Sequence, residues 1–307
     1  PDTPKPTEEA FIVTLSPIQE IPDTPKPTAE EAFTVTLSPV QAVTPEPTKE
    51  VTPVHNQKQN VEEWLSSTVS ISDGIKFEVV GRLEHDKNAF LEGLCFGNDG
   101  FLYESTGLFG KSDIRKLDPV DGTIIEKVEM NPVYFGEGLT IVNDSLVQLT
   151  YKKKKGFVYD MKDLDVAPST FDYTTPTGEG WGMTYDPDKD ELILNDGMDY
   201  LIFWDAQTYQ EKRTVKVVRQ DGTPAAQINE LEFWRGRVLA NVWFQDVILV
   251  INPETGVVEK EYDFSSLSYN KNGDRDAVLN GISVSDDPDL IYVSGKLWDT
   301  IFKVRLL

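Results

Sequence analysis

The sequence predicts an all-β domain, a five-bladed β-propeller, preceded by a disordered extension rich in Pro and Thr. Three observations lead to this fold. One tetrapeptide recurs five times at intervals of roughly 45 to 50 residues, which is the length of a four-stranded propeller blade. From Lys76 onward, short runs of Val, Ile, Phe and Tyr are bounded by Gly, Asp, Asn and Pro. No stretch carries a sustained helical period.

The repeated tetrapeptide marks the start of each predicted blade. Its copies are Leu91–Leu94, Gly136–Leu139, Gly180–Met183, Ile228–Leu231 and Leu279–Ile282. A second and a third run of β-forming residues follow each copy, and a fourth run follows in the first four repeats. The spacing therefore predicts one four-stranded sheet per copy.

The two ends of this domain complement each other. The last repeat reaches Leu307 before a fourth strand, while Phe77–Leu83 stands before the first copy without a blade. We expect Phe77–Leu83 to pair with Ile301–Arg305 and close the ring, because an open propeller would expose two sheet edges.

Residues 1–75 differ in composition from the domain at 76–307. The segment Pro1–Thr7 returns at Pro22–Thr28, as part of a tandem repeat of about 21 residues. Its prolines and its acidic, Thr-rich remainder cannot bury enough apolar surface to offset chain entropy, so we expect a disordered linker or stalk. An O-glycosylated stalk or a partner-binding tail is the alternative.

The composition excludes several classes of function. With 39% apolar residues the chain can build a core, and its formal charge of −23 repels nucleic acid. No apolar run is long enough to span a bilayer. One cysteine, Cys95, and two histidines, His55 and His85, are too few for an ordinary structural zinc site, and we expect Cys95 to be a buried core thiol.

The second position of the tetrapeptide forms a ring in the predicted fold, because the first strand of each blade faces the centre of a propeller. That ring contains Glu92, Glu137, Trp181, Asn229 and Asn280. Carboxylates, amides and an indole indicate a site for a small polar ligand, although such residues also satisfy the backbone of loops. Trp243 and Lys296, at the ends of second strands, add an indole and an ammonium group.

Several longer motifs resemble the plant and bacterial type of glutaminyl-peptide cyclotransferase. The resemblance covers about residues 77 to 307, in order and with the blade spacing. It is carried by 85–94 (HDKNAFLEGL), 103–107 (YESTG), 135–140 (FGEGLT), 180–184 (GWGMT), 229–232 (NELE), 240–243 (ANVW) and 295–298 (GKLW).

The resemblance implies an activity and a set of site residues. Such enzymes are five-bladed propellers that convert an N-terminal glutamine into pyroglutamate and release ammonia, without zinc or another cofactor. By position, Glu137 is the proton shuttle, and Asn229 and Lys296 are polar catalytic groups. The implied substrate-binding residues are Glu92, Phe90, Phe135, Trp181, Trp243 and Asn280. Peptides or proteins beginning with Gln are the implied substrates of a monomer in the secretory pathway, the extracellular space or the vacuole.

One position departs from the family pattern. Where that family has Phe-Thr-Gln-Gly-Leu, this chain has a carboxylate, Glu92, in place of the amide. If Glu92 approaches Glu137, repulsion should raise the proton affinity of one or both carboxyl groups. This departure keeps open a non-catalytic propeller that binds peptide ends. A second alternative is a propeller hydrolase whose calcium ligands would be Glu92, Glu137, Asn229 and Asn280.

Other conspicuous residues have structural explanations. We expect His85 to make a turn or inter-blade hydrogen bond, and Lys152–Lys155 to form a solvated hairpin tip. Trp204, Trp234 and Trp298 should pack between blades, with Trp298 bordering the site.

Overall fold

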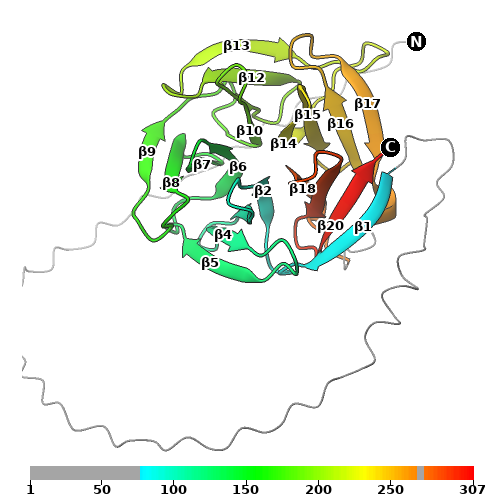
Figure 1. The fold of residues 1–307 in the computed structure, drawn as a ribbon. Helices are drawn as coiled ribbons and strands as arrows, with labels where there is room; N and C mark the ends of the chain where they lie inside the picture. Colours follow the sequence, from blue (N-terminus) through cyan, green and yellow to red (C-terminus); the bar gives the residue numbers. More distant parts are fainter. Residues whose placement is uncertain (1–76, 268–272) are drawn as a thin grey trace, which may run out of the picture. The chain divides into compact units, whose positions relative to one another are not determined.

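Five antiparallel sheets of four strands each surround a common centre (Figure 1). The structure, a computed structural model, describes residues 77–267 and 273–307. Within those ranges no helix is long and apolar enough to cross a bilayer. The predicted all-β, five-bladed fold is confirmed. The repeats of the extension and His55 lie outside the described residues, and the division at residue 75 stays a prediction.

Blades 1 to 4 each consist of four consecutive strands, of which the first lies innermost (Figure 1). Blade 1 comprises β2 (Leu91–Phe96), β3 (Leu102–Thr106), β4 (Asp113–Leu117) and β5 (Ile124–Glu129). Blade 2 comprises β6 (Gly136–Val142), β7 (Ser145–Thr150), β8 (Lys155–Asp160) and β9 (Ser169–Asp172). Blade 3 comprises β10 (Met183–Asp186), β11 (Glu191–Leu194), β12 (Tyr200–Asp205) and β13 (Glu211–Lys216). Blade 4 comprises β14 (Ile228–Trp234), β15 (Arg237–Val242), β16 (Val247–Ile251) and β17 (Val258–Asp263).

Blade 5 closes the ring with strands from both ends of the domain. Its order is β18 (Leu279–Val284), β19 (Leu290–Gly295), β20 (Thr300–Leu306) and β1 (Phe77–Glu84). The outer pair is antiparallel and runs from Phe77 opposite Leu306 to Glu84 opposite Thr300. The predicted closure is therefore confirmed, and both edges that an open ring would expose are paired.

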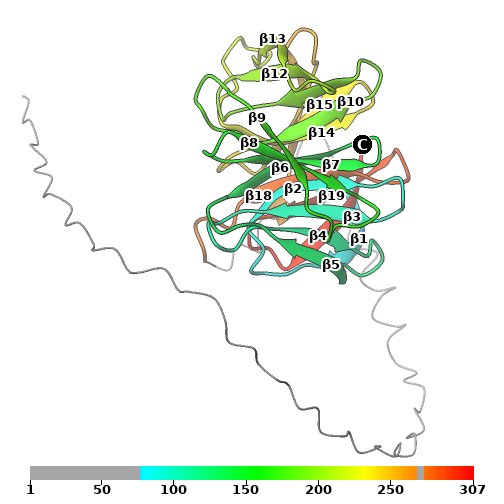
Figure 2. The same cartoon turned by 90° about the vertical axis from the view of Figure 1, so that its left-hand side faces the viewer.

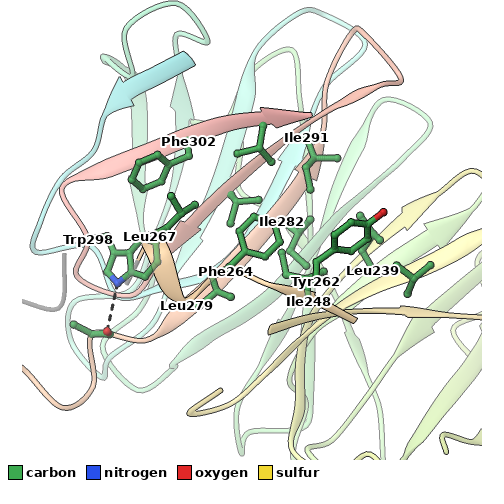
Figure 3. Close-up of a cluster of buried hydrophobic side chains, with 14 residues drawn as sticks. Leu239, Ile248, Tyr262, Phe264, Leu267, Leu279, Ile282, Ile291, Trp298 and Phe302 are labelled. Atoms are coloured by element: carbon green, nitrogen blue, oxygen red, sulfur yellow. Dashed lines mark hydrogen bonds between the residues drawn. The ribbon is translucent and has the colours of Figure 1, made fainter. Parts of the chain in front are cut away.

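The core lies between neighbouring sheets, which face each other in the side view of Figure 2. Between blades 4 and 5, for example, Phe264, Ile282 and Phe302 belong to one buried cluster (Figure 3). The inner strands are buried on both faces, whereas β5 and β13 alternate exposed and half-buried residues. This decrease in burial from the inner to the outer strands explains why the sequences of the inner strands are mostly apolar, whereas those of the outer strands alternate.

The repeated tetrapeptide produces the same local distortion in four blades. A register shift interrupts the pairing of β2, β6, β14 and β18 at the motif. The inner strands also approach closely there: a Cβ on Gly138 would lie 2.4 Å from the carbonyl oxygen of Trp181. Glycine therefore lets neighbouring blades meet, and the bulge redirects the preceding side chain.

The residues expected to be structural are placed accordingly. Cys95 is a buried free thiol in a core cluster. His85 contacts the carbonyl oxygen of Trp298 at 2.7 Å and Glu104 at 3.0 Å, so it joins blades 5 and 1 as predicted. Trp204 and Trp298 are fully buried in inter-blade clusters.

Two further predictions concern the surface. Lys152, Lys153 and Lys154 form the exposed turn between β7 and β8, as predicted for the solvated hairpin tip. Lys155, which was included in that prediction, is instead the half-buried first residue of β8. The indole of Trp234 donates to the carbonyl oxygen of Pro288 at 3.1 Å and so links blade 4 to blade 5.

Candidate active site

A pocket of about 200 Å³ lies where the inner strands begin, at the repeated tetrapeptides. Residues from all five blades and their connections surround it. They are Phe90, Glu92, Phe135, Glu137, Tyr151, Trp181, Asn229, Trp243, Asp276 and Lys296. Eight of the nine residues predicted for the site therefore line one cavity, all except Asn280.

Asn280 lies behind the pocket wall. It is fully buried, and its side-chain amide donates to the carbonyl oxygen of Leu91 at 2.8 Å and to Glu92 Oε2 at 3.3 Å. Its place is thus beside Glu92, which it helps to orient from outside the cavity.

Tyr151 and Asp276 were missed by sequence reasoning. Tyr151 directly follows β7, the same position that Trp243 and Lys296 occupy after β15 and β19. The blade repeat therefore contained the signal for Tyr151. Asp276 lies in the connection between β17 and β18, where no repeat marks it.

Polar side chains of neighbouring blades hold the backbone of the site. Ser105 Oγ donates to the carbonyl oxygen of Glu137 at 2.6 Å and accepts from Gln148 Nε2 at 2.7 Å. Asn195 Nδ2 donates to the carbonyl oxygen of Asn229 at 2.5 Å. These buried bonds fix two of the second-position residues in place, because each satisfies a carbonyl group inside the bulge.

Glu92 and Lys296 form a buried ion pair in the lining of the pocket. Lys296 Nζ lies 2.7 Å from both carboxylate oxygens, and the side chains of Lys296 and Glu92 are 7% and 2% exposed, respectively. The same ammonium group lies 4.7 Å from the centroid of the Phe90 ring. Lys296 is thus held in one orientation by a carboxylate and an aromatic face.

Glu92 and Glu137 have raised pKa values, the direction expected for two neighbouring buried carboxyl groups. Burial raises the pKa of Glu137 well above its usual range, the charge of Glu92 adds to this, and the ammonium of Lys296 opposes it. Burial likewise raises the pKa of Glu92, against the opposing effect of Lys296. Two carboxyl groups therefore share one cation, and Glu137 keeps its proton to a higher pH than a free glutamate.

Aromatic side chains form the walls. Trp181 and Trp243 meet edge to face at 5.6 Å between ring centroids, and Phe90 and Phe135 meet similarly at 6.1 Å. Trp181 Nε1 donates to Glu179 at 3.0 Å, which fixes the angle of the indole. The walls can pack against the apolar part of a ligand and keep water from the carboxyl groups.

The geometry weighs against the proposed calcium site. Both carboxylate oxygens of Glu92 face an ammonium group, and Asn280 directs its amide donor toward Glu92.

Comparisons with known proteins agree on one family. The sequence model of the family described as glutamine cyclotransferase matches residues 53–306. The chain is 37% identical over 246 residues to the glutaminyl-peptide cyclotransferase of Arabidopsis thaliana, with 78% of this chain and 74% of that protein covered. It is also similar to the crystal structure of Myxococcus xanthus glutaminyl cyclase, with 31% identity, a TM-score of 0.66, and coverage of 76% of this chain and 98% of that one.

Proposed function

This chain belongs to the glutamine cyclotransferase family, and we propose that it closes the N-terminal glutamine of peptides into pyroglutamate with Glu137 as the proton shuttle. The observation that carries the assignment of roles is the pocket itself. In this pocket Glu137, whose pKa is raised, lies with Glu92 and Lys296, and Glu92 is already paired with Lys296.

The reaction needs proton transfer and no nucleophile from the protein. The neutral α-amine of the substrate attacks its own side-chain carbonyl carbon, a new C–N bond forms, and the bond to the amide nitrogen breaks. The attacking nitrogen loses one proton, which Glu137 accepts and returns to the departing nitrogen, so ammonia leaves and Glu137 ends in its starting state. Since Glu137 must be ionised to accept that proton, its raised pKa moves the acid limit of its own step to higher pH, beside the requirement for a neutral substrate amine.

Lys296 and Asn229 are the proposed donors to the oxygen that becomes negative during attack. An ammonium group has three N–H bonds, so Lys296 can bind both oxygens of Glu92 and still direct one donor into the pocket. Glu92 thereby orients Lys296, a role that an amide at this position would fill without adding a second charge.

The aromatic walls are the proposed binding surface for the first residue of the substrate. Ring closure requires the α-amine and the side-chain carbonyl to be held together, and a narrow pocket between Trp181, Trp243 and Phe135 favours the coiled conformer. The substrates are peptides with an N-terminal Gln. We further propose that the protein acts as a monomer in the secretory pathway, the extracellular space or the vacuole and binds no nucleic acid, in keeping with its formal charge of −23.

The test is turnover of a short peptide that begins with Gln, with and without chelator, followed by ammonia release and by the mass of the peptide. We expect the protein to release one ammonia per peptide in both conditions. Glu137→Gln should lower kcat by roughly 10²- to 10⁴-fold, the range for loss of a general acid–base group. Glu129→Gln is the matched control, because Glu129 is an exposed carboxylate outside the pocket.

Two results would contradict the proposal. Full activity of Glu137→Gln would remove Glu137 from the role of shuttle. A parent protein that binds the peptide but releases no ammonia at any pH would support the non-catalytic alternative.

A further inference from the structure

Blade 4 departs from the other blades at the third position of the tetrapeptide. Glu230 stands where the other four copies have glycine, and its side chain is fully buried. It directly follows the pocket residue Asn229 on β14. Burial raises the pKa of Glu230 well above its usual range, and the charges of Glu232 and Glu92 add to this.

The carboxyl group of Glu230 contacts the backbone of two other blades. Oε2 accepts a hydrogen bond from the amide of Ile282 on β18 at 2.8 Å, and Oε1 accepts from the amide of Leu94 on β2 at 3.5 Å. One side chain of blade 4 therefore reaches both blade 5 and blade 1. Leu94 lies two residues after the pocket residue Glu92, and Ile282 lies two residues after Asn280, which donates to Glu92 from behind the pocket wall.

At the boundary between blades 4 and 5, side chains of blade 4 satisfy several backbone donors of one inner strand, β18. Three donors of β18, the amides of Gly281, Ile282 and Val284, are satisfied by Asn241 at 2.9 Å, Glu230 at 2.8 Å and Glu232 at 2.8 Å. Between blades 2 and 3, by contrast, the amide of Gly138 donates directly to the carbonyl oxygen of Trp181.

The position of β18 determines the position of the ion pair. Asn280 on β18 donates to Glu92, and the backbone amide of Lys296 donates to the carbonyl oxygen of Val278, just before β18. A displacement of β18 would therefore move Asn280 and Lys296 together, relative to Glu137 on β6.

We propose that Glu230 is a positioning residue for the cyclisation: by binding β18 and β2 together it fixes the Glu92–Lys296 pair at the working distance from Glu137 and Asn229. This inference depends on the proposed function of the pocket. Glutamine cannot reproduce the contact, because its amide nitrogen would oppose one of the two backbone donors, and glycine removes both acceptors.

The experiment compares Glu230→Gln and Glu230→Gly with Glu232→Gln. Glu232 is the matched control, since it makes the same kind of bond from the same strand, two residues farther from the pocket. We expect kcat to fall about three- to tenfold in Glu230→Gln and about ten- to a hundredfold in Glu230→Gly, with KM within about twofold, because misplaced groups lower the rate more than the affinity. Glu232→Gln should lower the melting temperature but leave kcat within about twofold of the parent.

The outcomes separate a positioning role from a structural one. If the melting temperature falls by the same amount in Glu230→Gly and Glu232→Gln, and both variants keep the kcat of the parent, then Glu230 is structural only and the inference is wrong. If the parent itself releases no ammonia, the proposed function fails first. The inference is then judged by infrared titration of the pocket carboxyl groups. Both Glu230 variants remove the charge of Glu230, so the pKa values of the pocket must shift more in Glu230→Gly, which loses both acceptors, than in Glu230→Gln.

Discussion

Two buried groups of charged residues differ in how completely their charges are matched. One joins blades 5 and 1 and contains His85, Glu104, Asp113 and Arg115, which we call the blade 5–1 cluster. Here Arg115 Nε lies 2.7 Å from Asp113, and His85 lies 3.0 Å from Glu104. Each carboxylate has its own cationic or histidine partner, as expected of a group whose role is structural.

The pocket, unlike the blade 5–1 cluster, has one cationic side chain in its lining for two glutamates. Glu92 and Glu137 share Lys296, and the pKa values of both carboxyl groups are raised. In the blade 5–1 cluster the raised pKa values belong instead to His85 and Arg115, which hold their protons more firmly. An unmatched carboxyl group that binds and releases a proton near the working pH is suited to catalysis, and a matched pair is suited to holding two blades together.

The largest expected effect comes from removing the charge of Lys296, which is the only Lys or Arg among the residues that line the pocket. Lys296→Met keeps the volume but leaves Glu92 without its partner, so we expect the free energy of unfolding to fall by about 3 to 5 kcal/mol, and cyclisation to be nearly abolished. Chemical denaturation at neutral pH measures the first effect and ammonia release the second. Lys303→Met is the control, because Lys303 makes a longer, partly exposed ion pair with Asp286. We expect Lys303→Met to lower the free energy of unfolding by roughly 1 kcal/mol. If Lys296→Met lowers it by no more than this, the comparison between the two groups of charges is wrong.

A smaller effect should follow when the second carboxylate is neutralised. Glu92→Gln removes the charge that, after burial, contributes most to the raised pKa of Glu137, and it leaves Lys296 free to turn toward Glu137. The pKa of Glu137 should therefore fall, and the acid side of the profile of kcat/KM against pH should move to lower pH by about one unit.

That profile must be measured with one peptide for both proteins, since the α-amine of the substrate titrates as well, at about pH 8. The limb of the substrate amine is common to both proteins, so only a limb that differs between them reports on Glu137. If no limb of the profile moves in Glu92→Gln, this prediction is wrong.

The smallest effect concerns the blade 5–1 cluster. Burial lowers the pKa of His85, but the charge and hydrogen bond of Glu104 outweigh it, so the folded-state pKa is raised. Protonated His85 therefore stabilises the fold below its unfolded pKa of about 6.5, and this contribution disappears as the pH rises through the folded-state value.

In His85→Gln the free energy of unfolding should be lower by about 1 to 2 kcal/mol at pH 6, and the difference from the parent should shrink at higher pH, while kcat stays unchanged. Denaturant unfolding at several pH values measures this difference, which also cancels the titration of the other buried groups. A change in kcat would show that the cluster is coupled to the pocket.

The repeat allowed most of the fold to be predicted. Each blade is a local meander, so the tetrapeptide and the runs after it specify their own sheet, and the unpaired Phe77–Leu83 left one way to close the ring. Pocket residues on the inner strands were equally accessible, because the repeat places them at one structural position.

The contacts that could not be predicted join residues far apart in the sequence. Lys296 and Glu92 are separated by 204 residues, and their ion pair forms only because blade 5 lies next to blade 1 in the closed ring. Asn280 was expected in the pocket wall because it occupies the same position of the tetrapeptide as Glu92, Glu137, Trp181 and Asn229. Its side chain instead donates to the carbonyl oxygen of Leu91 and to Glu92. Asp276 lies in a connection without a repeat, so no pattern could identify it.

The closure of blade 5 has a consequence for biosynthesis. The pairing of β1 with β20 joins residues 216 to 229 positions apart, as in the contact between Glu78 and Arg305, which are 227 residues apart. Blades 1 to 4 can form in turn as the chain leaves the ribosome, whereas β1 waits for β20. Glu92 is made early and Lys296 late, so the ion pair cannot form before most of blade 5 has been made. We expect a chain that ends before β20 to be inactive, because β19, which Lys296 directly follows, would lack the neighbouring strand that holds it in the blade.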